Sequence, residues 1–489
     1  MIKSRIFITT PIYYVNDKPH LGHTFTTLIA DVLSRYFRQE KKEVFFLTGT
    51  DEHGLKIFQS AKINNKDPKK FCDENSSLFK ETWKNLGIEY DKFIRTTDKD
   101  HIETVQYVLD ILKEKGDLYE KDYKGLYCID CENFVLEKDL INGLCPFHLK
   151  PPINISERNY FFKLEKYFGL VQKEIEKEKL KITPNSALKE TKGLLKQKLT
   201  DFSVSRIKEK VQWGVELPFD KNQVTYVWVD ALINYISAIG FYKNKNNFKK
   251  WWEEGYVLHI LGKDILKFHA IYWPAMLIAL NIKVPNEELI HGFFTVNGLK
   301  MSKTLKNTID PNELVRIYGS EATRYLLLSQ FPVSSDGDIK EAQFKEKYNT
   351  DLANRLGNLI SRVLSLENKA EFKQTKFNSS KIKPNFKKIL QETRNNYIHF
   401  MEDYKLFEAL QEIFKLVDYC NVYISQNKIW ELVGKKDKNS KLLLEQHLTD
   451  LSITLEEIRN LISPFLPKTS EKLGNLLKTK NPEPLFKRL

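Results

Sequence analysis

Residues 6–63 alternate between short apolar runs and amphipathic helical patterns, and this order restricts the chain to few folds. A β-rich run at 6–10 is followed by apolar residues at helical spacing over 21–36. A second β-rich run at 44–48 precedes another helical stretch. Strand, helix, strand, helix is the opening of a parallel α/β sheet. Such sheets bind ligands at the carboxyl ends of their strands, where helix N-termini face the crevice.

The rest of the chain divides by its pattern, and its 489 residues predict roughly two to four domains. A cysteine-bearing and then lysine-rich stretch interrupts the α/β pattern, which resumes with strand-like runs at 224–229 and 257–261. From 341 onward amphipathic helices predict a bundle. The predicted segments are 1–115 and 216–290 for the two halves of the α/β domain, 116–215 for an insert, 291–340 for a connecting region and 341–489 for the bundle.

The composition, with 42% hydrophobic and 29% charged residues, is that of a soluble globular protein. The net charge of +13 indicates a nucleic acid or an acidic membrane surface as partner, or simply a lysine-rich composition. No apolar run approaches the roughly 20 residues of a membrane span, and Pro11 breaks the one stretch that resembles a signal peptide. Three of the five cysteines lie within 128–145, which favours metal binding over disulfides and predicts a cytoplasmic protein.

A histidine pair stands at the start of the first predicted helix, in the string PHLGH at 19–23. His20 and His23 are three residues apart, so both imidazoles point toward one crevice, and Gly22 lets a nucleotide approach the backbone. Imidazoles can donate hydrogen bonds to phosphate oxygens. The alternatives are a zinc-binding pair or ordinary histidines at a helix start.

A lysine-rich loop follows the strand-like run at 292–296, with the string KMSKT at 300–304. Lys300 and Lys303 are suited to binding a polyphosphate leaving group as its charge develops. Taken alone this signal is weak, because most lysine pairs of this spacing are solvated surface.

Together the two strings resemble the two signatures of class I aminoacyl-tRNA synthetases. Further strings resemble the methionyl-tRNA synthetases: TTPIYYVN at 9–16, TGTDEHG at 48–54, VWVDA at 227–231, GKDI at 262–265 and HGFFTVNG at 291–298. The resemblance extends over nearly the whole chain. It implies a Rossmann-type catalytic domain in two halves, an inserted connective domain, a lysine-loop region and an α-helical anticodon-binding domain.

The resemblance also implies a methionine site. Asp51 matches the family's partner for the methionine ammonium, although a carboxylate there could instead cap the next helix. Seven residues match pocket positions and supply aromatic walls, aliphatic fill and two polar groups near the thioether, although each singly is more often a core residue. They are Ile12, Tyr14, Trp228, Ala231, Tyr235, Ile265 and His269. Gly262 and Asp264 match a ribose-binding position, and Met301 and Ser302 complete the implied ATP-binding set with Gly22.

Two short-spaced pairs, Cys128 with Cys131 and Cys145 with His148, are separated by thirteen residues. Each pair suits one knuckle of a tetrahedral zinc site, and four protein ligands make a closed, structural site. The alternative is a set of reduced buried cysteines. Some family members carry four cysteines over one or two metals, whereas this chain has one complete set, so it predicts one structural Zn²⁺.

The bundle is where the resemblance places tRNA recognition. Arg355, Asn421 and Trp430 match regions that contact the anticodon, and aromatic and amide or guanidinium side chains are the tools that read single-stranded bases. Trp430 could equally be a core residue of the bundle.

The implied function is that of a methionine–tRNA ligase. Methionine attacks the α-phosphate of ATP to give methionyl-adenylate and pyrophosphate, with Mg²⁺ sharing the phosphate charge, and the methionyl group then passes to the terminal ribose of tRNA(Met). Thr304 stands where the family usually has Ser, and the spacing after Arg206 leaves its role open. The chain lacks the extra domain that dimerises some relatives, which favours a monomer. The rivals are another class I synthetase and a non-catalytic RNA-binding protein on the same scaffold.

Overall fold

A computed structural model of the chain describes residues 4–130, 132–135, 137–146, 149–197, 199–296, 298–300, 309–372, 382–480 and 483–489. The chain forms two compact units. Unit 1 consists of Met1–Pro19, Glu40–Lys84 and Glu89–His291, and unit 2 of His20–Gln39, Asn85–Ile88 and Gly292–Leu489. Within the described residues, no helix combines the length and apolar character that a membrane span requires.

The central feature of unit 1 is a seven-stranded sheet in the order β2-β3-β1-β13-β14-β8, with β4 paired to β3. Its strands are β1 (Arg5–Thr9), β2 (Tyr13–Tyr14), β3 (Glu43–Asp51), β4 (Lys92–Arg95), β8 (Lys181–Thr183), β13 (Tyr256–Gly262) and β14 (Glu287–His291). All of these pairings are parallel. The strands β1, β13 and β14 are buried almost throughout, because a parallel sheet is covered on both faces. The predicted parallel α/β sheet is therefore confirmed.

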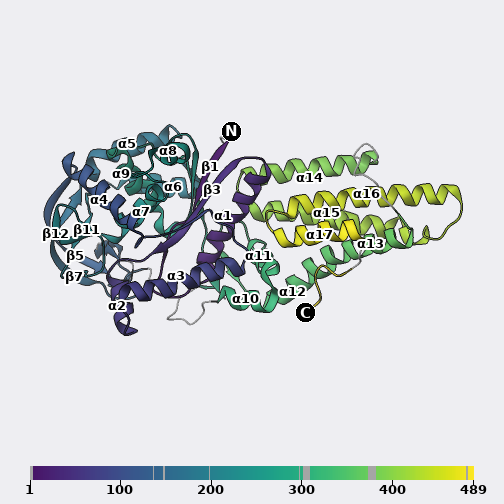
Figure 1. Ribbon diagram of the computed structural model, residues 1–489, viewed down its shortest axis with the longest axis horizontal. Helices are drawn as coiled ribbons and strands as arrows, with labels where there is room; N and C mark the ends of the chain where they lie inside the picture. Colours follow the sequence, from purple (N-terminus) through teal and green to yellow (C-terminus); the bar gives the residue numbers. More distant parts are fainter. Residues whose placement is uncertain are drawn as a thin grey trace. The chain divides into compact units, whose positions relative to one another are not determined.

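Helices surround this sheet and form the core of unit 1 with it (Figure 1). They are α2 (Leu55–Ile63), α3 (Pro68–Asn85), α4 (Lys99–Glu114), α5 (Leu164–Glu176), α6 (Asn185–Lys196), α7 (Val227–Ser237), α8 (Lys245–Phe248) and α9 (Trp273–Ala279), with π-helical segments η2 (Lys249–Glu253) and η4 (Phe268–Tyr272) and the 3-10 segment η3 (Lys263–Ile265). Phe7 of β1, Trp252 and Trp273 are completely buried in this core. Large aromatic side chains thus supply much of the apolar area that holds the sheet and its helices together.

The predicted insert forms a separate antiparallel sheet in the order β6-β5-β7-β9. Its strands are β5 (Leu118–Cys128), β6 (Asn133–Val135), β7 (Ile153–Phe162) and β9 (Phe202–Ser203). Residues 181–183 nevertheless leave the insert and join the main sheet as its edge strand β8, beside β14. The pattern around them is lysine-rich, and a three-residue strand is too short to show a period of its own.

One predicted strand is wrong. The run at 224–229 does not rejoin the parallel sheet: its first part ends β12 (Asp220–Thr225), and Val227 already begins α7. β12 belongs to a small antiparallel sheet with β10 (Ser205–Ile207) and β11 (Glu216–Leu217). A short apolar run fits a buried helix as well as a buried strand, so its periodicity could not separate the two.

Unit 2 combines α1 (Leu21–Gln39), a three-stranded sheet and a helical bundle. The sheet contains β15 (Phe294–Val296), β16 (Leu299–Lys300) and β17 (Gly337–Ile339). The helices are α10 (Pro311–Tyr318), α11 (Ser320–Leu328), α12 (Ala342–Lys347), the π-helical η5 (Tyr348–Gly357), α13 (Asn358–Lys369), α14 (Pro384–Glu402), α15 (Leu406–Gln426), η7 (Ile429–Glu431), α16 (Lys438–Ile462) and α17 (Pro467–Thr479). Figure 1 shows α14, α15 and α16 running alongside one another, which confirms the predicted bundle.

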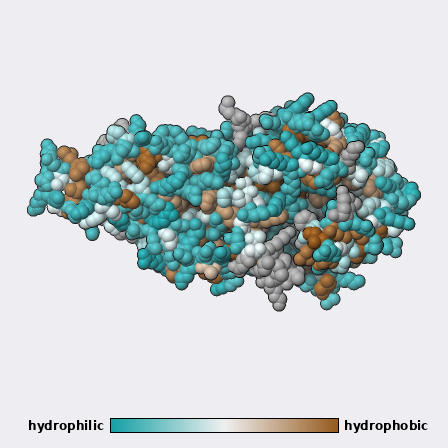
Figure 2. All heavy atoms as spheres, turned by 180° about the vertical axis from the view of Figure 1, so that it is seen from behind, coloured by the Kyte–Doolittle hydropathy of each residue, from teal (hydrophilic) through white to brown (hydrophobic). Residues whose placement is uncertain are grey.

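The surface agrees with the composition. The face drawn in Figure 2 is largely hydrophilic, with apolar residues in small scattered patches. Exposed apolar residues of this kind are ordinary on a protein surface, and only a few of them, such as Trp430 at 48% exposure, are large aromatic rings.

Candidate active site

Asp51 is the last residue of β3, at the carboxyl end of the parallel sheet. Its side chain is 6% exposed, and its Oδ1 has no hydrogen-bond partner among the described residues. Burial, followed by the nearby charge of Asp230, raises the pKa of the Asp51 carboxyl well above its ordinary value. The carboxylate accepts a backbone hydrogen bond from His53, but a buried oxygen that lacks a partner is costly, so this site would gain free energy from a cation with N–H donors.

The turn after Asp51 is held by Glu52, whose side chain is completely buried. Arg95 donates two hydrogen bonds to its carboxylate, at 2.7 and 2.9 Å, and Thr97 donates a third at 2.6 Å. Because hydrogen bonds to charged groups are the stronger ones, this cluster fixes the end of β3 against β4. The position of Asp51 is therefore set by the residue beside it.

Asp230 joins the end of β3 to α7 and α4. Its Oδ2 lies 2.7 Å from His53 Nδ1 and its Oδ1 lies 2.9 Å from His101 Nε2, while His101 Nδ1 lies 2.8 Å from Ser237 Oγ. Burial opposes ionisation of Asp230, but the His53 charge and the hydrogen bonds from both histidines lower the pKa of its carboxyl to about 2. Neither histidine was identified from the sequence as a site residue; His53 and Asp230 lie inside the quoted strings, whereas His101 carries no motif signal.

The first turns of α7 present three predicted pocket residues on one face, because Trp228, Ala231 and Tyr235 follow a spacing of three and four. The Trp228 ring stacks on Phe268 of η4, with ring centroids 4.1 Å apart and planes 9° apart. Trp228 also packs against the core of unit 1 while remaining only partly buried, as do three other predicted pocket residues. These are Ile12, Tyr14 and Ile265.

The two polar residues of the predicted pocket bond to each other. Tyr235 Oη lies 2.8 Å from His269 Nε2, and His269 Nδ1 lies 3.0 Å from the carbonyl oxygen of Ile265. Burial lowers the pKa of His269 to about 4, so the ring is neutral near pH 7. A carbonyl oxygen only accepts, so Nδ1 carries the proton and Nε2 accepts from the tyrosine hydroxyl. The sequence predicted both residues but not this pairing.

Gly262 is the last residue of β13, and Asp264 follows two residues later. A Cβ at Gly262 would lie 2.8 Å from Asp264 Oδ1, so glycine leaves room for that carboxylate as it is placed here. Asp264 is exposed, as a residue that accepts hydrogen bonds from ribose hydroxyls would have to be.

The histidine pair lies at the start of α1 in unit 2. The rings of His20 and His23 are stacked, with centroids 3.7 Å apart. The amide of Gly22 donates to His20 Nδ1 at 3.0 Å, and a Cβ at Gly22 would lie 2.9 Å from His20 Cε1. The helix start therefore brings both imidazoles together, as predicted.

The predicted lysine loop begins where β16 ends. Thr295 of β15 pairs with Lys300 of β16 in an antiparallel register. The side chain of Lys300 and the predicted site residues Met301, Ser302 and Lys303 lie outside the described residues.

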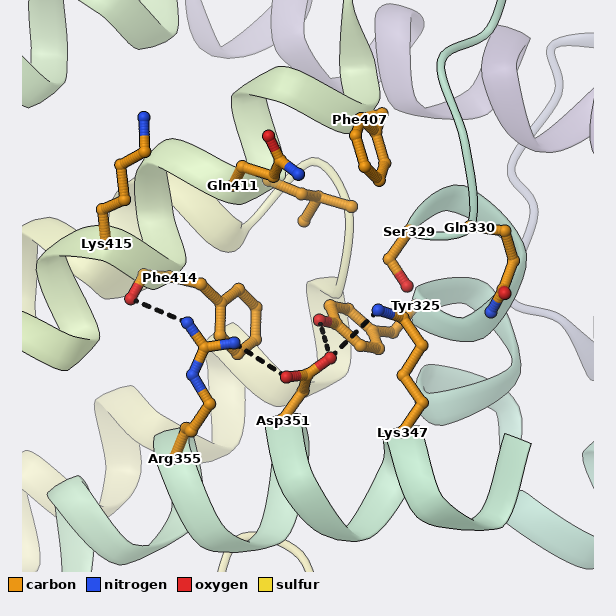
Figure 3. Close-up of a pocket in the computed structure, with 11 residues that line it drawn as sticks. Tyr325, Ser329, Gln330, Lys347, Asp351, Arg355, Phe407, Gln411, Phe414 and Lys415 are labelled. Carbon is orange, nitrogen blue, oxygen red and sulfur yellow. Dashed lines mark hydrogen bonds and ion pairs between the residues drawn. The ribbon is translucent and has the colours of Figure 1, made fainter. Parts of the chain in front are cut away.

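The predicted anticodon residues occupy different environments in the bundle. Arg355 lines a pocket of about 460 Å³, where its guanidinium donates to Asp351 at 2.7 Å (Figure 3). It also donates to Asp418 at 2.6 and 2.8 Å. Asn421 Nδ2 donates to the carbonyl oxygen of Arg355 at 3.2 Å. Both side chains are thus engaged within the protein, which makes Arg355 a link between η5 and α15.

Trp430 differs, because its ring is 48% exposed in η7. It lines a second pocket of about 260 Å³ together with Arg362, whose Nη2 donates to Ser425 Oγ at 3.2 Å. An exposed ring beside a guanidinium is a suitable surface for an unstacked base. Arg362 was missed from the sequence, where nothing separated it from other arginines of the bundle.

Two of the four predicted zinc ligands are described. Cys128 ends β5 and Cys145 lies in the following loop, and their side chains are 3% and 0% exposed. Cys131 and His148 lie outside the described residues, and within the described ones no group of three candidate ligands occurs. Glu132 and Leu149, the residues that follow each pair, have φ of 49° and 52°, so the two segments repeat one left-handed turn.

Arg206 is buried and forms a bidentate ion pair with Glu157, at 2.8 and 2.9 Å. Its guanidinium also lies 4.2 Å from the centroid of the Tyr127 ring. These contacts give Arg206 a structural role within the insert.

Comparisons with known proteins agree with this geometry. The family described as tRNA synthetases class I (M) matches residues 6–150 and 136–364, and the anticodon-binding domain of tRNA ligase matches residues 385–486. The methionine–tRNA ligase of Thermotoga maritima is 41% identical over 480 residues, which cover 96% of this chain and 74% of the relative. That of Clostridium tetani is 42% identical over 487 residues, covering 98% and 74%.

Solved structures give the same result. The Mycobacterium tuberculosis methionyl-tRNA synthetase in complex with methionyl-adenylate superposes with a TM-score of 0.90 at 32% identity, covering 97% of this chain and 94% of that one. Its apo form superposes with a TM-score of 0.81 at 30% identity, covering 97% and 92%. The chain thus belongs to the methionyl-tRNA synthetases, the methionine–tRNA ligases among the class I aminoacyl-tRNA synthetases.

Proposed function

We propose that Asp51 receives the ammonium of methionine in unit 1. The observation that carries this proposal is the unpartnered Oδ1 of a carboxylate that is 6% exposed. An ammonium has three donors, so it would satisfy this oxygen and stabilise the ionised form that burial disfavours. The thioether is proposed to lie against the seven predicted pocket residues. These are Ile12, Tyr14, Trp228, Ala231, Tyr235, Ile265 and His269.

The activation step is proposed to be positioning and charge stabilisation. The methionine carboxylate attacks the α-phosphate of ATP, and the bond from that phosphorus to the bridging oxygen breaks to release pyrophosphate. His20 and His23 donate to phosphate oxygens from the start of α1, and Lys300 and Lys303 stabilise the leaving pyrophosphate. Mg²⁺ bound to the phosphates would neutralise part of their charge.

The remaining contacts of ATP follow the same assignment. Asp264 accepts from the ribose hydroxyls, and Gly262 leaves room for its carboxylate. Gly22, Met301 and Ser302 complete the proposed ATP-binding set. The methionyl group then passes to the 3′-terminal ribose of tRNA(Met), whose anticodon bases Trp430, Asn421 and Arg355 are proposed to contact.

The insert is proposed to hold one structural Zn²⁺ through Cys128, Cys131, Cys145 and His148. The burial of both described thiols and the repeated left-handed turn support this donor set. Bound zinc would stabilise the fold of the loop and supply no chemistry to the reaction. The five-segment division of the chain, a monomeric state and a cytoplasmic location are proposed with it.

The experiment that tests the activation step is methionine-dependent exchange of pyrophosphate into ATP. We expect Lys303→Ala to reduce exchange by about 100- to 1,000-fold, the usual loss for one transition-state donor, while methionine binding changes little. Lys99→Ala serves as the control, since Lys99 is 85% exposed. Equal losses of exchange and methionine binding in Lys303→Ala would argue for a structural role of that lysine.

A further inference from the structure

Glu132 is an acidic residue of the insert whose side chain belongs to none of the predicted catalytic, substrate-binding, anticodon or zinc residues. It stands between β5 and β6, directly after the predicted ligand Cys131, and its side chain is only 4% exposed. Its backbone has a φ of 49°, a conformation that residues other than glycine adopt rarely. An acidic side chain this deeply buried, on a backbone conformation that costs energy, is expected to have hydrogen-bond partners that stabilise it.

The partners of Glu132 come from three segments that carry or adjoin predicted methionine-site residues. From β2, the Tyr14 hydroxyl lies 3.1 Å from Glu132 Oε1. From the start of α2, which follows the turn after Asp51, the amide of Lys56 donates to the same oxygen at 2.6 Å. Directly before α7, the Tyr226 hydroxyl donates to the carbonyl oxygen of Glu132 at 2.6 Å.

The second carboxylate oxygen of Glu132 is bound within the insert, because the Tyr127 hydroxyl of β5 donates to Oε2. The insert therefore supports the carboxylate from behind while its other oxygen faces Tyr14. The Tyr14 hydroxyl and Glu132 Oε1 pack closely against Gly54: a Cβ at that position would lie 2.3 Å from the hydroxyl and 2.8 Å from Oε1.

Tyr14 links this contact to the site itself. It pairs with Asp51 in the register of β2 and β3, and its hydroxyl also lies 2.7 Å from the carbonyl oxygen of His53. A rotation of the Tyr14 ring would thus change the wall of the predicted pocket, directly beside the strand position of Asp51. Glu132 is the group that restrains this rotation from the insert.

We propose that Glu132 is a positioning residue for methionine binding, through which the insert fixes Tyr14 and the turn after Asp51. The inference rests on the proposed assignment of Tyr14 and Trp228 to the methionine pocket. Glu132 itself touches neither substrate nor ATP in this account. Its loss should therefore weaken methionine binding and leave the chemical step of bound methionine nearly unchanged.

The test is a comparison of kinetic constants in pyrophosphate exchange, with methionine Kd from calorimetry. Glu132→Gln is expected to raise the KM and Kd for methionine about tenfold, the effect of weakening one hydrogen bond to a charged group, with little change in kcat or in the KM for ATP. Tyr14→Phe should have a similar effect. Tyr14→Phe removes the contacts of the hydroxyl with both Glu132 and the carbonyl oxygen of His53, so the double variant should be no worse than Tyr14→Phe alone.

Asp117→Asn is the matched control. Asp117 directly precedes β5, at the end of that strand opposite to Glu132. It is a buried carboxylate and likewise accepts a hydrogen bond from a tyrosine hydroxyl, that of Tyr167, at 2.7 Å. It should lower Tm without changing the KM for methionine. If Glu132→Gln fails to fold, Tyr127→Phe carries the test, because it removes the hydrogen bond to Glu132 Oε2 and leaves the predicted pocket residues unchanged.

Three outcomes would overturn the inference. The first is an unchanged methionine KM in both Glu132→Gln and Tyr14→Phe while Trp228→Ala raises it, which leaves the pocket assignment intact. The second is an equal rise in Asp117→Asn, which would indicate a general effect of insert stability. The third is an unchanged methionine KM in Trp228→Ala, which would contradict the proposed methionine pocket and therefore also the inference that rests on it.

Discussion

The ring of Phe25 lies 4.5 Å from the ring of Phe294, measured between centroids, and both rings contact Phe331. Phe25 belongs to the second turn of α1, the helix that begins beside His20 and His23, and Phe294 begins β15, which leads through β16 to the lysine loop. Two stretches some 270 residues apart in sequence are therefore joined by one aromatic cluster within unit 2. That the imidazole pair and the lysine pair act on one triphosphate stays a prediction, and this cluster offers a way to test it.

Phe25→Ala should separate phosphate handling from methionine binding. Removing a buried phenyl ring costs about 3–5 kcal/mol and leaves a cavity, so Tm should fall. A shift of about 1 Å between catalytic groups can cost roughly 100-fold in rate, so exchange of pyrophosphate should fall as well. Methionine Kd, measured by calorimetry, should change little. Phe25→Leu is the control that keeps most of the volume, and a normal exchange rate in Phe25→Ala would count against the role of this cluster.

A buried ion pair fixes α1 against α11. Asp31 Oδ2 lies 2.6 Å from Arg324 Nη2, and both side chains are completely buried. The guanidinium also donates to the carbonyl oxygens of Phe465, Pro464 and Leu86. Breaking a buried pair from one side costs about 3–5 kcal/mol because the other charge stays unpaired, so Asp31→Asn should unfold at a markedly lower urea concentration.

The control for Asp31 is Glu43→Gln, which removes the acidic partner of Arg5 in a surface pair with side chains 39% and 46% exposed. Exposed pairs contribute about 0–1 kcal/mol, so this variant should unfold close to the wild-type midpoint. If Asp31→Asn and Glu43→Gln unfold at similar urea concentrations, the buried Asp31–Arg324 pair contributes no more to stability than an exposed pair.

The buried neutral imidazole of His269 predicts a loss of stability in mild acid. Its folded pKa of about 4 lies below the ordinary value of 6.5, so between these limits the unfolded chain binds the proton and the folded chain does not. Stability from this group is complete above pH 6.5 and falls as the pH drops toward 4. His269→Gln should flatten the dependence of Tm on pH in this window, although His259, whose pKa burial also lowers, leaves some slope. His399→Gln, at an exposed position, should keep the wild-type slope.

Strands β1, β3 and β13 could be predicted because each contains a mainly apolar run followed by glycine or proline. The failure at 224–229 has a different cause. Val227 and Val229 are buried on a helix that is apolar on most sides, and such a helix shows no clear hydrophobic period. The short strand β8 could not be found either, since its place in the sheet depends on β14 rather than on its own three residues.

The site divides in a similar way. Asp51, Trp228 and Tyr235 lie in or beside strings that carry the family resemblance, so they could be predicted as site residues from the sequence. His101 and Glu132 reach the same region from α4 and from the insert, and their roles depend on which side chains the fold places opposite them. Contacts between segments so distant in sequence leave no local pattern in a single chain.

The predicted zinc site can be tested by metal analysis of the purified protein. We expect one equivalent of zinc per chain, and Cys145→Ser should lower this content because it removes one of four ligands. Chelation of the metal should lower Tm, since a structural zinc contributes to folding. Cys420→Ala, at a buried cysteine of α15, should keep its zinc. Wild-type protein without zinc would contradict the prediction.

Trp430 and Arg355 should respond differently to substitution, although both were predicted to contact the anticodon. Trp430 is 48% exposed, and a base stacked on it contributes about 1–3 kcal/mol, so Trp430→Ala should raise the KM for tRNA in aminoacylation without changing Tm or pyrophosphate exchange. Arg355→Ala leaves Asp351 and Asp418 without their shared cation, so it should lower Tm as well. Leu442→Ala, at an apolar residue of α16 that is 56% exposed, is the control for loss of exposed apolar surface. If Trp430→Ala charges tRNA as well as the wild type while Leu442→Ala does not, the base-stacking surface lies elsewhere on the bundle.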